Sequence, residues 1–230
     1  MTRAIFFDFG GTLVEPMRDG FPVFAEVLGR RGHPLDRPSY DRAQAIVGRT
    51  AGPEYLHLGK SPGFWDTYHA GVLDRLGLVD PDGGIVSELH EAFTSPRWHP
   101  PYLESAEVLR GLKGRGLDLH LVSNNTDYLP ELVGRLGWSP LFRSITYSQE
   151  VGAEKPDPRI FRLALGRAGC APGEVLHVGD SWEADVLGAR AVSIPALWID
   201  RAGRGPPAPA PSARDLRGVL DHLDRGSRAT

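Results

Sequence analysis

The chain has 230 residues, of which 41% are hydrophobic and 24% are charged, and its formal net charge is −3. A small net charge and the lack of a long apolar run argue against nucleic-acid binding and against a membrane segment. The single cysteine, Cys170, excludes an internal disulfide and a cysteine-based zinc site. We therefore expect a cytoplasmic globular protein whose partner is a small-molecule substrate.

A short apolar stretch near the N-terminus ends in a single carboxylate. Ile5 to Phe7 carry the β-branched and aromatic side chains typical of a buried strand, and Asp8 follows them directly. Gly10 and Gly11 then predict a tight turn. A carboxylate at the end of a buried strand is costly unless it is paired or has a chemical task. Asp8 is therefore either a turn residue or a functional group.

The rest of the chain divides into a helical stretch and an alternating one. From residue 20 to residue 94, apolar residues recur at three- and four-residue spacing, which predicts several amphipathic helices. Strands are predicted over 117–124, 144–148, 174–180 and 195–200, with helices between them and a last helix over 212–223. This alternation predicts an α/β fold with a Rossmann-like, doubly wound parallel sheet. We expect a core of residues 1–19 and 95–230, with a helical cap domain of residues 20–94 inserted after the first strand.

Polar groups suited to phosphoryl transfer follow the predicted strands, where α/β sheets bind their ligands. The Asp8 carboxylate can act as a nucleophile and form an aspartyl-phosphate. Lys155 offers a compact cation that offsets charge on the transferring group. Asp180 and Asp185 are hard oxygen ligands of the kind that Mg²⁺ prefers. Ser123 and the glycine turn add hydroxyl and backbone N–H donors for phosphate oxygens.

Four short motifs occur in order, each after an expected strand: FFDFGGT, LVSN, EKPDP and HVGDSWEAD. Together they resemble the motifs of the haloacid dehalogenase superfamily of hydrolases, and residues 20–94 correspond to its helical, C1-type cap. The resemblance implies that Asp8 is the nucleophile, with Ser123 and Lys155 as further catalytic residues. It implies phosphate binding by Gly11, Thr12, Ser123, Asn124 and Lys155, and Mg²⁺ binding by Asp8, the backbone carbonyl of Gly10, Asp180 and Asp185.

The chain departs from the phosphatases of that superfamily at one position. Those enzymes have a second aspartate two residues after the nucleophile, which protonates the leaving alcohol and later activates water. Here the position holds Gly10, and the loss of general acid–base catalysis typically costs ~10²–10⁴ in rate. A replacement acid would have to come from Glu15 or from the cap.

Three functions are compatible with this departure. The first is a Mg²⁺-dependent phosphatase, weak or specialised, that acts on a small phosphomonoester with a good leaving group. The second is hydrolysis of a carbon–halogen or carbon–phosphorus bond, for which a phosphonatase would need the single cap lysine, Lys60, to form a Schiff base. The third is phosphate or partner binding without turnover. The acids of GDSWEAD differ from the fourth motif of the metal-free dehalogenases, and we expect the phosphatase.

Several other residues with chemically versatile side chains are expected to be structural. His120 and His177 fall inside predicted strands and are expected to be core residues. Phe64, Trp65 and Tyr68 fit the packed face of a cap helix, although one of them could instead line the substrate side of the cap.

Overall fold

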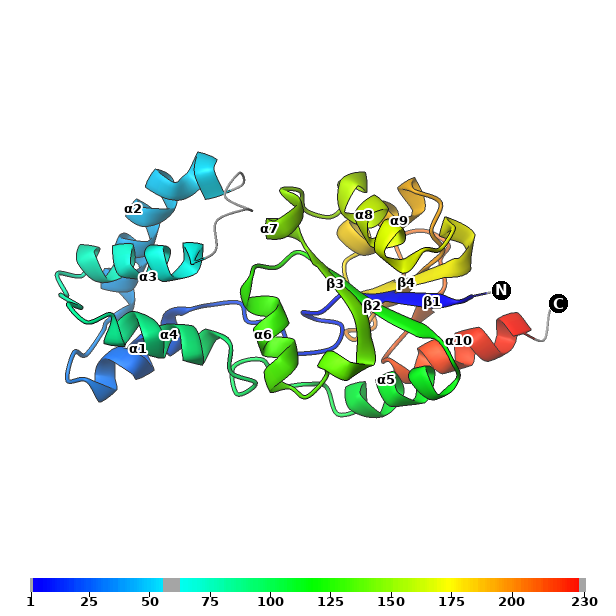
Figure 1. The fold of residues 1–230 in the computed structure, drawn as a ribbon, viewed down its shortest axis with the longest axis horizontal. Coiled ribbons are helices and arrows are strands. Elements are labelled where there is room, and N and C mark those ends of the chain that lie inside the picture. The colour runs from blue at the N-terminus through cyan, green and yellow to red at the C-terminus, as the bar shows by residue number, and fades with distance from the viewer. Residues whose placement is uncertain (1, 56–62, 228–230) are drawn as a thin grey trace.

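The computed structural model describes residues 2–55 and 63–227, which form two lobes (Figure 1). The larger lobe contains a parallel sheet with the strand order β3-β2-β1-β4-β5-β6. This sheet confirms the predicted Rossmann-like, doubly wound α/β fold. The strands are β1 (Ala4–Phe7), β2 (Asp118–Ser123), β3 (Phe142–Tyr147), β4 (Val175–Gly179), β5 (Ala196–Ile199) and β6 (Ser212–Ala213).

Strand β1 lies in the centre of the sheet, and all of its residues are buried. Phe7 pairs with Leu121 of β2 on one side and with Val178 of β4 on the other. The strand order therefore reverses at β1, and its carboxyl end is the topological switch point where ligands bind in such sheets. Asp8 is the first residue beyond that end.

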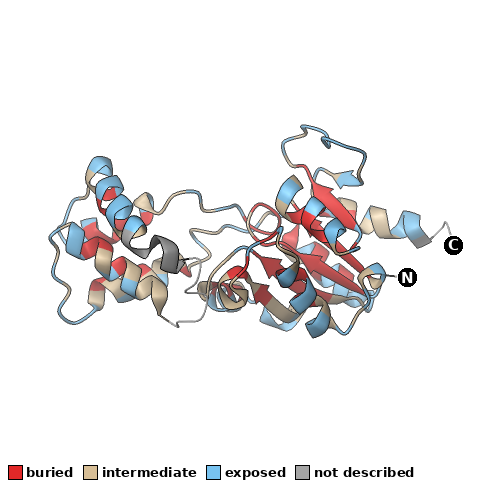
Figure 2. Ribbon diagram, turned by 90° about the horizontal axis from the view of Figure 1, so that it is seen from above, coloured by how far each residue is buried: buried red, intermediate tan, exposed pale blue. Residues whose placement is uncertain are grey.

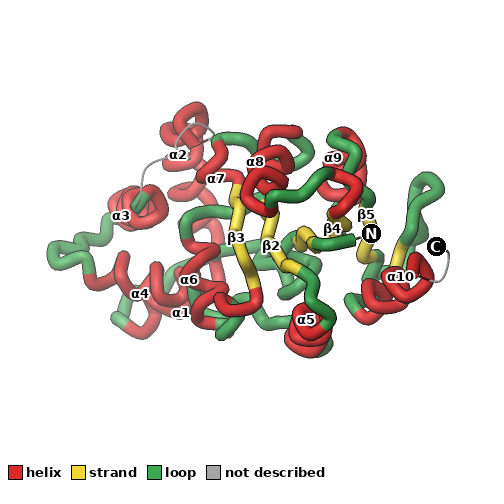
Figure 3. Tube along the Cα trace, turned by 45° about the vertical axis from the view of Figure 1, so that its right-hand side comes forward, coloured by secondary structure: helices red, strands yellow, loops and turns green. Residues whose placement is uncertain are grey.

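Helices cover both faces of the sheet because alternate residues of a strand point to opposite sides. Ile5 and Phe7 pack with α5, α6 and α10 in one apolar cluster, whereas Ala4 and Phe6 pack with α8 and α9 in another. Figure 3 shows α8 and α9 on one side of the strands and α5 and α10 on the other. These helices are α5 (Ser105–Gly114), α6 (Tyr128–Arg135), α8 (Pro158–Ala168), α9 (Gly188–Ala191) and α10 (Arg217–Ser227).

The smaller lobe has an apolar core of its own, to which α1, α3 and α4 contribute buried residues at helical spacing. Figure 2 shows this lobe set apart from the sheet and joined to it by extended segments. The two connecting segments pair with each other, because Val14 and Pro101 form an antiparallel bridge and the Glu15 N–H donates to the Pro100 carbonyl at 2.9 Å. The helices are α1 (Phe21–Arg30), α2 (Arg37–Tyr55), α3 (Phe64–Arg75) and α4 (Gly84–Phe93).

The prediction of a last helix over 212–223 is wrong at its start. Ser212 and Ala213 pair with β5 as the edge strand β6, and α10 begins only at Arg217. Its buried side chains, among them Val219, then cover the sheet. The predicted helix over 182–191 begins as a π-helical turn, Trp182–Leu187, before α9. Shorter helical pieces are α7 (Ser148–Val151) and the 3₁₀ turns Ser139–Leu141 and Pro172–Glu174.

Within the part of the chain that the structure describes, no helix has the length and apolar character needed to cross a bilayer.

Candidate active site

The carboxyl ends of β1, β2 and β4 bring three predicted site residues together. Asp8 follows β1, Ser123 ends β2 and Asp180 follows β4. Because these strands are neighbours in one parallel sheet, their carboxyl ends lie at the same edge. Lys155 and Asp185 reach the same point from the loop after α7 and from the π-helical turn.

The ammonium group of Lys155 bridges two carboxylates. Its Nζ lies 2.7 Å from Asp8 Oδ1 and 2.6 Å from Asp185 Oδ1, and all three residues are buried. Burial disfavours the charged ammonium, but the carboxylates of Asp185 and Asp8 outweigh it and raise the pKa of Lys155. Ser123 Oγ donates a second hydrogen bond to Asp8 Oδ1 at 3.1 Å. The predicted nucleophile is therefore held at one oxygen by a cation and a hydroxyl.

Asp185 is the most strongly hydrogen-bonded acid of the group. Besides Lys155, its oxygens accept from His177 Nε2 at 2.9 Å and from the backbone N–H of Ser181 at 3.0 Å. Burial alone would raise the pKa of Asp185, but Lys155 and His177 outweigh burial and hold this pKa well below its usual range. His177 is buried, as expected for a core residue, yet it also positions a site carboxylate.

Three carboxylates, those of Asp8, Asp180 and Asp185, converge so closely that their oxygens lie within 4.8 Å of one another. Burial, with the negative charges of Asp8 and Asp185 beside it, raises the pKa of Asp180 to about 6. Burial likewise raises the pKa of Asp8, despite the opposing charge of Lys155. The hydroxyl of Thr12 lies between Asp8 and Asp180, at 3.4 and 3.5 Å from their oxygens. One ammonium does not neutralise three carboxylates, so the cluster suits a divalent cation.

The two glycines of the nucleophile turn have different steric constraints. Gly11 has φ = +86°, and a Cβ built there would lie 2.4 Å from Asp180 Oδ2, so no other residue fits without displacing the acid. A Cβ on Gly10 would meet only Pro16, at 3.8 Å, which is ordinary van der Waals contact. The turn requires glycine at position 11 but has room for a side chain at position 10.

Asn124 fastens the lysine loop to the end of β2. Its side-chain oxygen accepts from the backbone N–H of Lys155 at 2.6 Å, and its amide nitrogen donates to the Lys155 carbonyl at 3.0 Å. The residue also lines the cavity above Asp8. The contacts of its side chain thus position Lys155.

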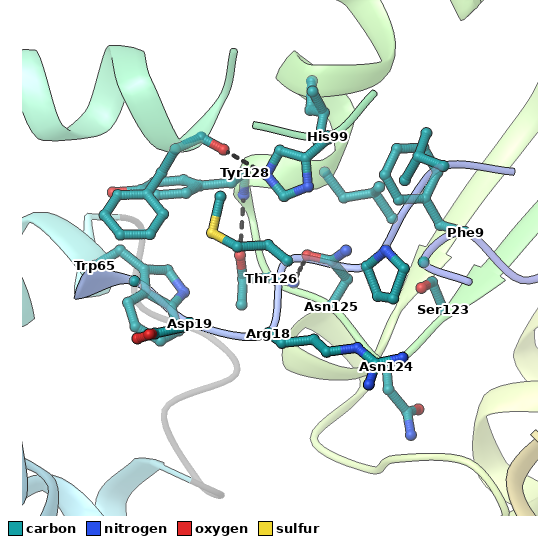
Figure 4. A pocket seen from close by; sticks show the side chains of 18 of the residues that line it. Phe9, Arg18, Asp19, Trp65, His99, Ser123, Asn124, Asn125, Thr126 and Tyr128 are labelled. Atoms are coloured by element: carbon teal, nitrogen blue, oxygen red, sulfur yellow. Dashed lines mark hydrogen bonds between the residues drawn. The ribbon is translucent and has the colours of Figure 1, made fainter. Parts of the chain in front are cut away.

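A cavity of about 790 Å³ lies between the lobes and includes Asp8 in its lining. Figure 4 shows Ser123 and Phe9 at one end of this cavity and Trp65 and Tyr128 at the other. Trp65 belongs to α3 of the helical lobe, and Tyr128 belongs to α6 of the larger lobe. Both lobes therefore contribute to the surface that a substrate on Asp8 would meet.

The described residues that line the cavity include two histidines but not Glu15, which is exposed. His99 Nε2 donates to the carbonyl of Phe93 at 3.0 Å (Figure 4), an interaction that leaves Nδ1 as the free acceptor of a neutral ring. Burial lowers the pKa of His99, which favours this neutral form. Lys60, the candidate for Schiff-base chemistry, lies outside the described residues.

Arg201, which follows β5, was not predicted as a site residue. Its Nε and one terminal nitrogen donate to the carbonyls of Gly11 and Thr12 at 3.2 and 2.7 Å, and the other terminal nitrogen binds Glu104 at 2.8 Å. The guanidinium also lies 3.4 Å from the ring centre of Tyr102. Arg201 therefore fixes the peptide groups of the nucleophile turn. The strand-end rule, applied to β5 as well, would have pointed to it.

The chain matches the model of the haloacid dehalogenase-like hydrolase family over residues 2–193, and it belongs to that family. It is 41% identical over 206 residues to the mouse haloacid dehalogenase-like hydrolase domain-containing protein 3, covering 86% of this chain and 81% of the relative. It is 43% identical over 139 residues to a phosphoserine phosphatase of Thermus thermophilus, covering 58% of this chain and 55% of the relative. The fold resembles that of a 2-haloacid dehalogenase from Pseudomonas syringae, with a TM-score of 0.78, 21% identity and coverage of 98% and 99%. The protein is a hydrolase of this family.

Replacement of Arg201 by glutamine should disorder the nucleophile turn. Hydrogen bonds to a charged group contribute about 1.5–3 kcal/mol each, and we expect the melting temperature to fall by roughly 5–10 °C. With p-nitrophenyl phosphate as the test substrate, kcat should fall by a larger factor than KM rises, because the variant misplaces the turn without removing a substrate contact. Glu104→Gln is the matched control, since it leaves both carbonyl contacts of Arg201 in place. An unchanged kcat in Arg201→Gln would contradict the positioning role.

Proposed function

We propose that this hydrolase is a phosphatase that acts on phosphomonoesters whose leaving group departs without protonation. The observation that carries the proposal is the Asp8–Lys155–Asp185 bridge, with Asp180 beside it and glycine at position 10. A nucleophilic carboxylate, a fixed cation and spare acids for a divalent metal form a set suited to phosphoryl transfer. The phosphatase name of the Thermus relative supports the same reaction class.

In the first step the Asp8 carboxylate attacks phosphorus, forming a P–O bond while the ester oxygen leaves with its electron pair. Ser123 and Lys155 hold one oxygen of Asp8 and so fix the direction of the carboxylate. The charge of Lys155 lies next to the transferring group and offsets the charge that develops on it. In the second step a water oxygen attacks phosphorus, the bond to Asp8 breaks with its electron pair returning to the carboxylate, and the water protons leave with the product as dihydrogen phosphate.

The kind of leaving group that we expect is inferred from glycine at position 10. With no carboxyl group at position 10 and with Glu15 exposed, no acid from the nucleophile turn reaches the ester oxygen. Aryl and acyl phosphates release oxygens of low basicity, which depart as anions, whereas an alkoxide needs a proton. We therefore expect aryl and acyl phosphates to react and alkyl phosphates to react poorly.

We propose Mg²⁺ as the cofactor, held by Asp8, Asp180, Asp185 and the backbone carbonyl of Gly10. These residues suit Mg²⁺ because they offer oxygen ligands with an excess of negative charge, which this ion prefers. When bound, Mg²⁺ supplies positive charge that stabilises the phosphoryl oxygens.

We also propose that residues 20–94 act as the cap. Helices α1–α4 carry their own apolar core, and residues of this lobe line the cavity over Asp8. Movement of such a lobe against the sheet would admit the substrate and then exclude bulk water.

The test is hydrolysis of p-nitrophenyl phosphate and acetyl phosphate, with Mg²⁺ and with EDTA, by the wild type and by Asp8→Asn. We expect metal-dependent turnover that falls at least roughly 10³-fold in the variant, because the amide is not a nucleophile. Asp200→Asn is the matched control, since this buried acid follows β5 and does not line the cavity. Turnover equal in the wild type and Asp8→Asn would refute the phosphatase, and chloride release from a 2-haloacid in EDTA would favour dehalogenation instead.

Gly10→Asp should restore the missing proton carrier, because the backbone has room for a side chain there. We expect kcat/KM for phosphoserine, an alkyl phosphate, to rise about 10²-fold, while p-nitrophenyl phosphate changes little. Gly10→Asn has the same shape without the titratable proton and should not show this gain. Equal effects of aspartate and asparagine would mean that protonation does not limit the reaction.

Mg²⁺ should stabilise the folded protein through the three acids. At a concentration about tenfold above Kd, binding contributes about 1.4 kcal/mol, so a thermal melt should shift upward by roughly 3–6 °C. Protons compete for Asp180, whose pKa is about 6, so the shift should be largest above this pKa and should shrink as the pH falls through it. The rise in melting temperature caused by Mg²⁺ should disappear in Asp180→Asn. An equal rise in that variant would mean that the ion binds elsewhere.

A further inference from the structure

Aromatic rings line the end of the cavity opposite Ser123. We call five of them the aromatic wall: Trp65, Tyr68, His69, Phe93 and Tyr128, all of which line the cavity. The sequence analysis placed Trp65 and Tyr68 on the packed face of a helix and left open that one of them lines the substrate side. Both are half-buried and both face the cavity.

The rings of the wall lie against one another. Trp65 and Tyr68 have ring centres 5.2 Å apart, and Trp65 lies 6.3 Å from Tyr128 of the other lobe. His69 stacks on Phe93 with centres 4.8 Å apart and planes inclined by only 19°. The wall therefore crosses from the helical lobe to the sheet lobe, and Figure 4 shows Trp65 and Tyr128 on the same side of the cavity.

Polar contacts behind the wall hold Tyr128 in place. Its hydroxyl donates to Asp66 Oδ1 at 3.0 Å, and its ring lies 4.5 Å from that of His90. His90 in turn contacts Asp66 at 3.0 Å and Glu131 of α6 at 2.8 Å. The rings at the boundary between the lobes are thus already ordered, which reduces the entropy that a ligand must offset.

His69 is the most deeply buried ring of the wall. His69 is only 2% exposed, and its Nδ1 has no hydrogen-bond partner among residues 2–55 and 63–227. Burial lowers the pKa of His69 to about 4, so the ring is neutral at physiological pH. A neutral ring stacked on Phe93 keeps this part of the wall apolar.

We propose that the aromatic wall binds the ring of an aryl phosphomonoester, a phosphorylated phenol, while the phosphate lies on Asp8. This inference rests on the proposed function and names its substrate class. Two independent features agree: glycine at position 10 selects leaving groups of phenolic acidity, and aromatic residues from both lobes line the cavity that the leaving group would occupy. A volume of about 790 Å³ accommodates a phosphate together with a substituted ring.

The test compares two phosphonates, which bind as phosphate mimics and are not hydrolysed as esters. Affinities of phenylphosphonate and methylphosphonate for the Mg²⁺-loaded protein are measured by calorimetry for the wild type, Trp65→Leu, Tyr68→Leu and Trp65→Phe. Trp98→Leu is the matched control, a half-buried aromatic that packs on the apolar core of the helical lobe and is absent from the described lining of the cavity. Thermal melts confirm that each variant is folded.

We expect the wild type and Trp98→Leu to prefer phenylphosphonate about tenfold. Trp65→Leu and Tyr68→Leu should each reduce this preference about threefold or more, and Trp65→Phe should keep most of it. Equal affinities in the wild type, or a preference unchanged in both leucine variants, would overturn the inference. Hydrolysis of acetyl phosphate, whose acetyl group is too small to need the wall, reports separately on the proposed function.

Discussion

The ammonium group of Lys155, buried between Asp8 and Asp185, is the interaction on which the rest of the site depends. Buried carboxylates without a cation would take up protons, because a charge in a low-dielectric interior is costly unless it is paired. A protonated Asp8 would be a poor nucleophile. Lys155 therefore opposes the rise in the pKa of Asp8 that burial causes, and it fixes the direction of the proposed nucleophile at the same time. The negative charge that Lys155 leaves uncompensated is what makes the same pocket suitable for a divalent cation.

Lys155 lies in a loop and not in a helix or strand, and contacts to its backbone hold it in place. Asn124 holds both backbone groups of Lys155 at the end of β2. Gly188 lets Pro156, the residue after Lys155, pack closely against it, since a Cβ at position 188 would lie 2.8 Å from Phe161 and 3.0 Å from Pro156. Close packing thus explains the glycine at position 188, after the fourth motif. A larger residue there would push the loop that carries Lys155 away from the sheet.

The parts of the site that could be predicted are those attached to strand ends. Asp8, Ser123 and Asp180 follow from hydrophobic runs that end in polar residues, because parallel strands place their carboxyl ends at one edge. Arg201 also lies just beyond a strand end, but its role could not be predicted, since its partners are backbone carbonyls that no sequence pattern reveals. The orientation of Trp65 was also undetermined: it depends on how the helical lobe packs against Tyr128, which is a tertiary contact. The edge strand β6 was missed because two residues carry no periodicity.

Gly10 and Gly11 look alike in the sequence but differ in what their environment allows. At Gly11 a positive φ and the nearby Asp180 forbid a side chain, whereas at Gly10 only Pro16 comes near. The missing acid at position 10 is therefore not a consequence of backbone strain, because the backbone there accepts a Cβ. What distinguishes this turn is its chemistry, which under the proposed function limits it to leaving groups that depart as anions. The cavity wall around Trp65 comes from a separate segment of the chain and favours flat, apolar groups, so two unconnected parts of the sequence favour the same kind of ligand.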